Sequence, residues 1–234
     1  KKEKIVFIPV KTNVLGLKDS TGSFTTSDIQ NLCYYMYQSL IIPITEVSPN
    51  ILDLSLNEDF KVIIDRNTGI EKYGKYIYDF NSQYENNPQN HNTTYIDKGL
   101  WEDASNFFSE VRNLFFTDED INGKLKNEKY RDYQLIFLME VTTYDGTPGQ
   151  VERVGEKNVI LFNSMRYPTT MAHEVYHSLG LFHTHREETP IEETQRKYIY
   201  QKRTTTNLMS YNGFNRKSLW RWQWYIINPN IKER

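Results

Sequence analysis

Three histidines stand close together in the last third of the chain, in the run His-Glu-Val-Tyr-His-Ser-Leu-Gly-Leu-Phe-His that begins at His173. On a helix, residues four positions apart lie one turn above each other, so His173 and His177 present their imidazoles to the same point. A helix cannot bring His183 back to that point. Gly180, however, can take a positive φ, end the helix and let the chain return. Three neutral imidazoles around one point are the ligand set of a catalytic zinc site, with a fourth position left for water.

Glu174 follows the first histidine on the same predicted helix. The zinc does not need its carboxylate as a ligand, so we expect Glu174 to act as general base toward a water at the metal. The alternative is a chance His-Glu-x-x-His on an amphipathic helix, whose histidines are merely hydrogen-bonded. The length of the motif and a separate Met209-Ser210-Tyr211 downstream argue against that alternative.

The pattern resembles the metzincin clan of zinc metallopeptidases, and the resemblance rests on six residues over about the last third of the chain: His173, Glu174, His177, Gly180, His183 and Met209. The continuation from Gly180 to Thr184 looks most like the pappalysin-type and related bacterial members. Where those relatives often carry a phenylalanine, this chain has His185, which therefore competes with His183 as third ligand. The glycine-to-histidine spacing of the clan favours His183.

The resemblance implies an α+β fold, in which a twisted mixed sheet with backing helices is followed by a small C-terminal lobe and the active-site cleft lies between them. We expect one catalytic domain over residues 1–234, with an N-terminal lobe to about residue 182 and a C-terminal lobe from about residue 183. The resemblance also gives Met209 the role of an apolar floor beneath the imidazoles. Within the clan, the tyrosine at the position of Tyr211 binds the metal or the oxyanion in some branches and is structural in others.

The function implied is that of a zinc-dependent endopeptidase acting on protein or peptide substrates, in which Glu174 also returns the proton to the leaving amine. A zinc-binding interaction module without catalysis is one alternative, but a purely structural zinc site has no use for Glu174. A secreted bacterial effector or toxin domain that uses the same proteolysis is another, and the content of Lys, Asn, Ile and Tyr permits it. The chain opens Lys-Lys-Glu-Lys without an initiator methionine, and we expect a mature or excised domain that is secreted or extracellular.

Composition limits the partners. The net charge of -2 provides no overall field that would favour nucleic acid or anionic membranes, and no apolar run has the length of a membrane span. The oligomeric state stays open.

Cys33 is the only cysteine, so no internal disulfide can form. Its apolar surroundings favour a small core residue over the zinc-silencing thiol that some clan members carry on a propeptide.

Short apolar, β-branched runs predict strands ahead of the zinc-binding motif, over residues 4–10, 41–47, 60–65, 133–141, 150–154 and 157–162. We expect the substrate to bind in extended form along the 150–154 strand by strand addition. Residues 66–98 are rich in Asn, Gln, Tyr and Gly and show no period, which indicates a loop-rich insertion. His91 lies there and is expected to be a solvated loop residue.

Four helices are predicted. The first is capped by Ser27 or Asp28 and runs to about residue 40, with one apolar face made of Ile29, Leu32, Cys33, Met36, Tyr37 and Leu40. The second covers residues 100–116, and the third covers about residues 171–179, capped by Thr169 or Thr170. The last begins at Ser218 and carries three tryptophans, for which core packing is favoured over a membrane or partner surface.

The segment from Asp118 to Gly123 begins like a calcium-binding loop. The acid that should complete such a loop falls at position 129, which is Lys129, and Glu128 is one residue short. We therefore expect a polar turn at the end of the second helix, with a Ca²⁺ site as the weakly supported alternative.

Overall fold

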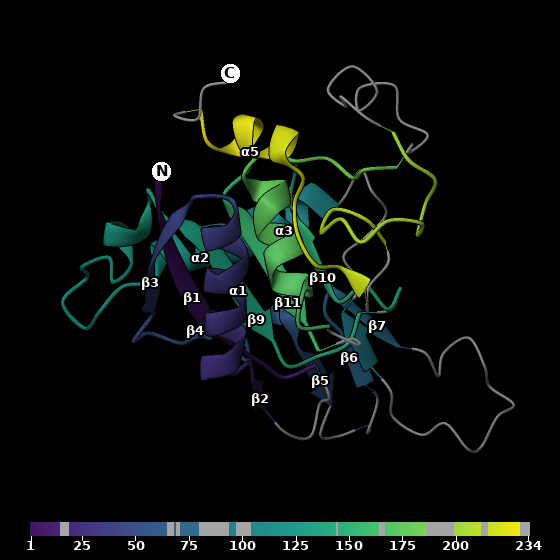
Figure 1. Cartoon of the computed structure of the whole chain (residues 1–234). Helices are drawn as coiled ribbons and strands as arrows, with labels where there is room; N and C mark the ends of the chain where they lie inside the picture. The colour runs from purple at the N-terminus through teal and green to yellow at the C-terminus, as the bar shows by residue number, and fades with distance from the viewer. Residues whose placement is uncertain are drawn as a thin grey trace, which may run out of the picture.

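The computed structural model is an α+β arrangement built on a mixed, open sheet of seven strands (Figure 1). The α+β class and the mixed sheet predicted from the sequence are therefore confirmed. The parts of the chain that the structure describes are residues 1–14, 19–64, 68, 71–79, 94–96, 104–143, 145–163, 167–185, 199–211 and 215–229.

The centre of the sheet is β1 (Lys2–Thr12), which runs parallel to β9 (Gln134–Met139). β9 in turn runs parallel to β11 (Asn158–Phe162). These strands confirm the predictions over residues 4–10, 133–141 and 157–162, with shifted ends. The first strand is longer than predicted because its polar ends also find partners in the ladder, where backbone pairing rather than side-chain type decides the bounds.

β10 (Gly149–Val151) pairs antiparallel with β11 and forms one edge of the sheet. The strand predicted over residues 150–154 is thus present at an edge, but it ends at Val151 because the chain bends at residues 152 and 153. On the other side of β1 lie β3 (Ile42–Val47) and β4 (Leu52–Asp53), both parallel to it. β2 (Ser20–Thr21) pairs antiparallel with the end of β1.

The central strands are apolar on both faces. In β1, Ile5 and Phe7 pack into one core cluster, and Val6 and Ile8 pack into the other; all four side chains have 0% exposure. Successive side chains of a strand point to opposite faces, so an uninterrupted apolar run means that both faces are covered.

Helices provide that cover. α2 (Ala104–Thr117) packs on the face that carries Val6 and Ile8. α1 (Thr26–Gln38) and α3 (Thr170–Ser178) lie side by side on the opposite face, in front of the sheet in Figure 1. α5 (Arg221–Ile227) joins the same cluster as α1 and α3 through buried Ile227 and partly buried Trp224, which confirms in part the predicted core packing of this helix; all three tryptophans are half-buried.

The start of α1 differs from the prediction. The N-cap is Thr25 rather than Ser27 or Asp28: its hydroxyl accepts a hydrogen bond from the Asp28 backbone N–H, and the Asp28 carboxylate accepts one from the Thr25 N–H. This reciprocal capping box pairs two backbone donors that would otherwise lack partners at the first turn. Asp28 therefore contributes to the N-terminal cap as the third residue of the helix.

The predicted apolar face of α1 is narrower than expected. Leu32 and Met36 are buried, but Tyr37 and Leu40 are each 56% exposed. Leu40 has a φ of 58°, which places it beyond the end of the helix, so the helical period no longer applies there. Cys33 is half-buried rather than a core residue, and burial raises the pKa of its thiol.

The strand predicted over residues 60–65 begins later. Residues Glu58–Phe60 form a 3₁₀ turn, in which the Asn57 side chain accepts a hydrogen bond from the Asp59 N–H, and β5 (Val62–Ile64) follows. The Asn57 cap, which the apolar pattern does not reveal, accounts for the difference.

The loop-rich interpretation of residues 66–98 is wrong in part. The region contains β6 (Glu71–Tyr73), which pairs with β5, and the pair formed by β7 (Ile77–Asp79) and β8 (Thr94–Ile96). Each ladder is three residue pairs long, too short for a period of two to stand out in the sequence. His91 lies outside the described residues.

The bounds of the other helices also shift. α2 is described from Ala104, and Leu100 and Trp101 lie outside the described residues. α5 begins three residues after Ser218, because Ser218 forms an extended bridge with Asn207 instead of starting the helix.

The segment after α2 is a polar turn. The Asp120 carboxylate accepts hydrogen bonds from the backbone N–H groups of Asn122 and Lys124, and the Asp118 carboxylate forms an ion pair with Lys126. These bonds lower the pKa of Asp120. The Asp120 carboxylate is thus engaged by the backbone and the Asp118 carboxylate by Lys126.

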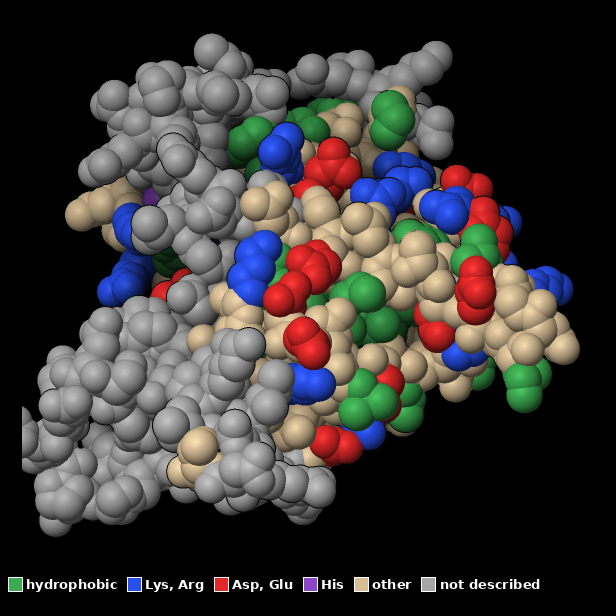
Figure 2. All heavy atoms as spheres, turned by 180° about the vertical axis from the view of Figure 1, so that it is seen from behind, with side chains coloured by type: hydrophobic (Ala, Val, Ile, Leu, Met, Phe, Trp, Pro, Cys, Tyr) green, Lys and Arg blue, Asp and Glu red, His purple; other side chains and the backbone are tan. Residues whose placement is uncertain are grey.

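Figure 2 shows positive and negative side chains interspersed over the described part of the rear face. None of the helices in the described ranges combines the length and the apolar content that crossing a bilayer requires.

Candidate metal centre

The first two histidines of the motif are positioned by α3, which begins one residue before the predicted start and ends one residue before the predicted end. Thr169 occupies the N-cap position, one of the two predicted, but its side chain forms no capping hydrogen bond; the Thr170 hydroxyl accepts a hydrogen bond from the Tyr167 N–H. Every side chain of α3 is buried, because the helix lies between the sheet and the C-terminal segment. A buried helix holds its side chains in fixed rotamers, which a metal site needs.

The end of α3 turns the chain back as predicted. Gly180 has a φ of 102°. Its N–H donates to the His177 carbonyl, and the Leu181 N–H donates to the Tyr176 carbonyl, each at 3.0 Å. These two bonds define a Schellman motif, the helix ending that glycine favours. They direct the following residues back along the helix, so that His183 reaches the first two histidines.

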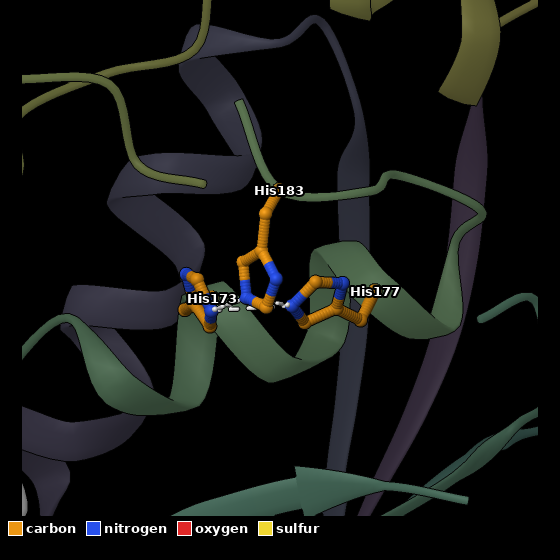
Figure 3. Close-up of side chains that lie close together, drawn as sticks. All are labelled: His173, His177 and His183. Carbon is orange, nitrogen blue, oxygen red and sulfur yellow. Dashed lines mark hydrogen bonds between the residues drawn. The ribbon is translucent and has the colours of Figure 1, made fainter. Parts of the chain in front are cut away.

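The three imidazoles converge (Figure 3). The Nε2 atoms of His173 and His177 are 3.1 Å apart, those of His173 and His183 are 3.1 Å apart, and those of His177 and His183 are 3.0 Å apart. Two of these side chains are buried and His183 is half-buried. The residues whose spacing predicted a metal site are thus brought together, and each offers one nitrogen to a common point.

The geometry fits a tetrahedral zinc ion. Ligands at the usual Zn–N distance of about 2.0–2.1 Å around a tetrahedral ion stand roughly 3.3 Å apart. The observed 3.0–3.1 Å separations lie within a few tenths of an ångström of this value. Among the described residues, no fourth His, Cys, Asp or Glu joins this group, and three protein ligands with an open fourth position are typical of catalytic rather than structural zinc sites.

Hydrogen bonds at the far side of two rings fix their tautomers. His173 Nδ1 lies 2.7 Å from the Leu208 carbonyl oxygen, and His177 Nδ1 lies 2.7 Å from the Leu181 carbonyl oxygen. A carbonyl can only accept, so both Nδ1 atoms carry the proton and both neutral rings present Nε2 lone pairs. Two lone pairs facing each other at 3.1 Å repel unless a cation lies between them. A hydrogen bond from the second ring nitrogen to a carbonyl group is also what orients metal-binding imidazoles in metalloproteins.

Protonation of His173 does not readily take the place of the metal ion between these lone pairs. Burial lowers the pKa of the His173 imidazole well below its ordinary value, and the neighbouring His177 and Arg216 side chains lower it further. The ring is therefore neutral at physiological pH, which is the state that binds a metal ion.

Glu174 lies beside the site on α3, with 8% of its surface exposed. It packs against the edge strand: a Cβ atom added to Gly149 would stand 3.1 Å from Glu174 Cγ and 2.8 Å from Leu161 Cδ2. Only glycine at this position of β10 allows the strand to approach the helix so closely. The general-base candidate is therefore held between the metal ligands and the open edge of the sheet.

The methionine turn supports the ligands through its backbone. The Asn207 side chain accepts from the Met209 N–H, and the Asn207 carbonyl accepts from the Ser210 N–H, so the turn is closed on itself. Its carbonyl groups face the site: Leu208 accepts from His173, and Met209 accepts from the Thr184 N–H. The Met209 side chain is completely buried in the core cluster of α3.

Tyr211 lies beside the three histidines and is 41% exposed. Its ring centroid is 4.4 Å from that of His183 and 6.3 Å from that of His173. Lys202 Nζ lies 4.6 Å from the same ring. His185 stacks on His183 with centroids 4.9 Å apart, and it does not belong to the group of converging nitrogens. The structure therefore places both Tyr211 and His185 against the His183 ring, and the Tyr211 and His185 ring centroids are 4.6 Å apart.

Arg216 was not predicted as a site residue. It is 8% exposed, and its electrostatic neighbours include Glu174, Tyr211 and His173. In the sequence it stands in the polar run Asn215-Arg216-Lys217, and no feature of the sequence distinguishes it from its two exposed neighbours. The carbonyl groups of Leu181 and Leu208 were also missed, because backbone acceptors leave no trace in residue type.

Comparisons of the chain with protein-family models, with curated proteins and with solved structures find no match. An inference about function therefore depends on the residues of the site itself.

Proposed function

We propose that this chain is a zinc-dependent endopeptidase of the metzincin type. The observation that carries the proposal is the convergence of three Nε2 atoms within 3.1 Å of one another, two of them in rings whose Nδ1 protons are held by carbonyl groups. A divalent cation relieves the repulsion of these lone pairs, and histidine nitrogen is a preferred ligand of zinc.

His173, His177 and His183 would hold the zinc ion. When bound, the zinc supplies Lewis-acid polarisation of a carbonyl oxygen and lowers the pKa of a water molecule. Glu174 would accept a proton from the attacking water and would later deliver it to the leaving amine. Its burial next to the ligands supports this role, since a general base must stand within hydrogen-bonding reach of the proton that it removes.

The edge strand β10 supports a peptide as substrate. Its outer side is not paired within the described sheet, so an extended peptide can add to it as a further strand. At Gly149, β10 packs so closely on α3 that this strand lies against Glu174. A peptide along β10 would therefore pass directly beside the general base, and this proximity favours peptide-bond hydrolysis over other zinc-dependent hydrolysis.

Membership of the metzincin clan would divide the chain into two lobes, with the boundary near His183. The sheet with α1 and α3 forms the N-terminal lobe, and the segment that contains the methionine turn and α5 forms the C-terminal lobe. The open fourth position and buried Glu174 weigh against a silent zinc-binding module. A role as a secreted effector or toxin domain stays a prediction.

The test begins with zinc-loaded protein and a proteome-derived peptide library, analysed by mass spectrometry together with the metal content. We expect one zinc ion per chain and cleavage within peptides, both lost after chelation and restored by added Zn²⁺. The Glu174→Gln variant, loaded in the same way, controls for contaminating peptidases. Stoichiometric zinc without cleavage of any peptide would exclude the endopeptidase function and leave the metal site in place.

A further inference from the structure

Arg216 is a charged residue in the wall of the metal site that the proposed chemistry does not use. Its side chain is buried, and its Nε atom has no hydrogen-bond partner. Among the ion pairs formed between described residues, none involves Arg216. A buried N–H donor without a hydrogen-bond partner costs free energy, and an acceptor from a bound ligand would supply the partner that Arg216 Nε lacks.

The backbone places Arg216 beside the methionine turn. The Lys217 N–H donates to the Thr206 carbonyl and the Leu208 N–H donates to the Ser218 carbonyl, each at 2.8 Å, which aligns residues 217–218 with residues 206–208. Leu208 is also the residue whose carbonyl holds His173. Arg216 therefore directly precedes a segment whose backbone is bonded to the support of the first histidine.

The neighbours of Arg216 define its position around the metal. Its charge acts on Glu174 and on the hydroxyl groups of Tyr35, Tyr167 and Tyr211, while burial lowers the pKa of the guanidinium. These groups come from α1, from the residue run before α3, from α3 and from the turn after Met209. Three phenol groups and the general base thus lie close enough to Arg216 to act on its charge, and phenol groups and guanidinium together suit a carboxylate.

We infer that Arg216 is a specificity-determining residue that binds a substrate carboxylate close to the scissile peptide bond. This inference rests on the proposed peptidase function and deepens it by naming the substrate class. The carboxylate belongs either to the C-terminus of the peptide or to an Asp or Glu side chain. A guanidinium binds either group through two parallel hydrogen bonds, which an ammonium group cannot reproduce.

The experiment uses zinc-loaded protein and the best-cleaved sequence from the peptide library, synthesised in matched pairs. One pair ends two residues beyond the cleaved bond as free acid or as amide. The other pairs carry Asp or Asn at each of the two positions on either side of that bond. The measured quantity is the ratio of kcat/KM within each pair, and the pair with the largest ratio identifies the source of the carboxylate.

We expect a preference of about 10- to 100-fold for the carboxylate member of one pair, as a charge-assisted hydrogen-bonded pair provides. Arg216→Gln should bring that ratio close to one, and Arg216→Lys should retain only a small part of it. Lys217→Gln, which removes a positive charge from the adjacent exposed residue, is the matched control and should keep the wild-type ratio. Ratios near one in the wild type, or a preference that survives both Arg216 variants, would overturn the inference.

A binding measurement separates this inference from the proposed function. Zinc-loaded Glu174→Gln protein is titrated with fluorescent acid and amide peptides, with and without Arg216→Gln. Tighter binding of the acid that depends on Arg216, in a protein whose wild type cleaves no peptide, supports the carboxylate site and rejects the peptidase. Cleavage of neutral peptides with equal binding of acid and amide supports the peptidase and rejects the carboxylate site.

Discussion

His173 Nδ1 donates a 2.7 Å hydrogen bond to the carbonyl oxygen of Leu208, thirty-five residues further along the chain. The residue before Met209 therefore fixes the tautomer of the first ligand. This bond gives the methionine turn a function that does not depend on contact between the methionine side chain and the metal. The turn positions a backbone acceptor, and the buried Met209 side chain anchors the turn in the core.

Removing ligands should remove the zinc. The His173→Ala, His177→Ala double variant keeps only His183, and a single imidazole does not retain zinc at micromolar protein concentration. We expect one zinc ion per wild-type chain and none in the variant, measured by elemental mass spectrometry on dialysed protein. Undiminished zinc in the double variant would show that the metal is bound elsewhere.

His185 should be dispensable for metal binding. It stacks on His183 but does not converge with the three Nε2 atoms. His185→Phe preserves an aromatic ring against His183 while removing both nitrogens, so zinc content should stay at one per chain. His183→Phe is the matched variant and should weaken zinc binding severely. The reverse result would make His185 the third ligand.

Glu174→Gln should separate zinc binding from turnover. The amide keeps the shape of the side chain between α3 and Gly149 but cannot take the proton of water. We expect kcat to fall by about 10²-fold or more, because a positioned general base contributes on that order. Zinc content and thermal stability should remain close to those of the wild type. A Gln variant with wild-type turnover would exclude Glu174 as the base.

Tyr211→Phe decides between the two roles of this tyrosine. If the hydroxyl stabilises the oxyanion, kcat and kcat/KM should fall together by about 10- to 10³-fold, with little change in KM. The ring contact with His183 survives in the variant, so zinc should be retained. Unchanged kinetics together with a lower melting temperature would make Tyr211 a structural residue.

Gly149→Ala should displace the general base. The added methyl group would meet Leu161 Cδ2 at 2.8 Å and Glu174 Cγ at 3.1 Å, so β10 and α3 must move apart. We expect kcat/KM to fall by about 10-fold or more, since misplacement of a catalytic group by a fraction of an ångström is costly. Gly146→Ala is the control: its φ of 71° strains alanine, but no atom lies within 4 Å of the new Cβ. It should lower stability by about 1 kcal/mol and leave activity intact.

The convergence of the three histidines could be predicted from the sequence more readily than the elements around them. His173, His177 and Gly180 could be interpreted together because helical spacing and the conformational freedom of glycine are local properties. The capping box at Thr25 and the short ladders of β6, β7 and β8 could not, because they depend on partners that the local pattern does not specify. Arg216 escaped prediction for the same reason, since its burial results from the packing of segments distant in sequence.

The order of the site along the chain has a consequence for folding. β1 pairs with β9 across about 130 residues, as in the register of Ile5 with Gln134, and such distant pairing makes folding slow. The site needs still later segments, because the acceptor for His173 is Leu208 and the partner of Leu208 is Ser218. During synthesis, the zinc ligands therefore emerge before the backbone that orients them. The three-histidine site would therefore be complete only once almost all of this sequence has folded.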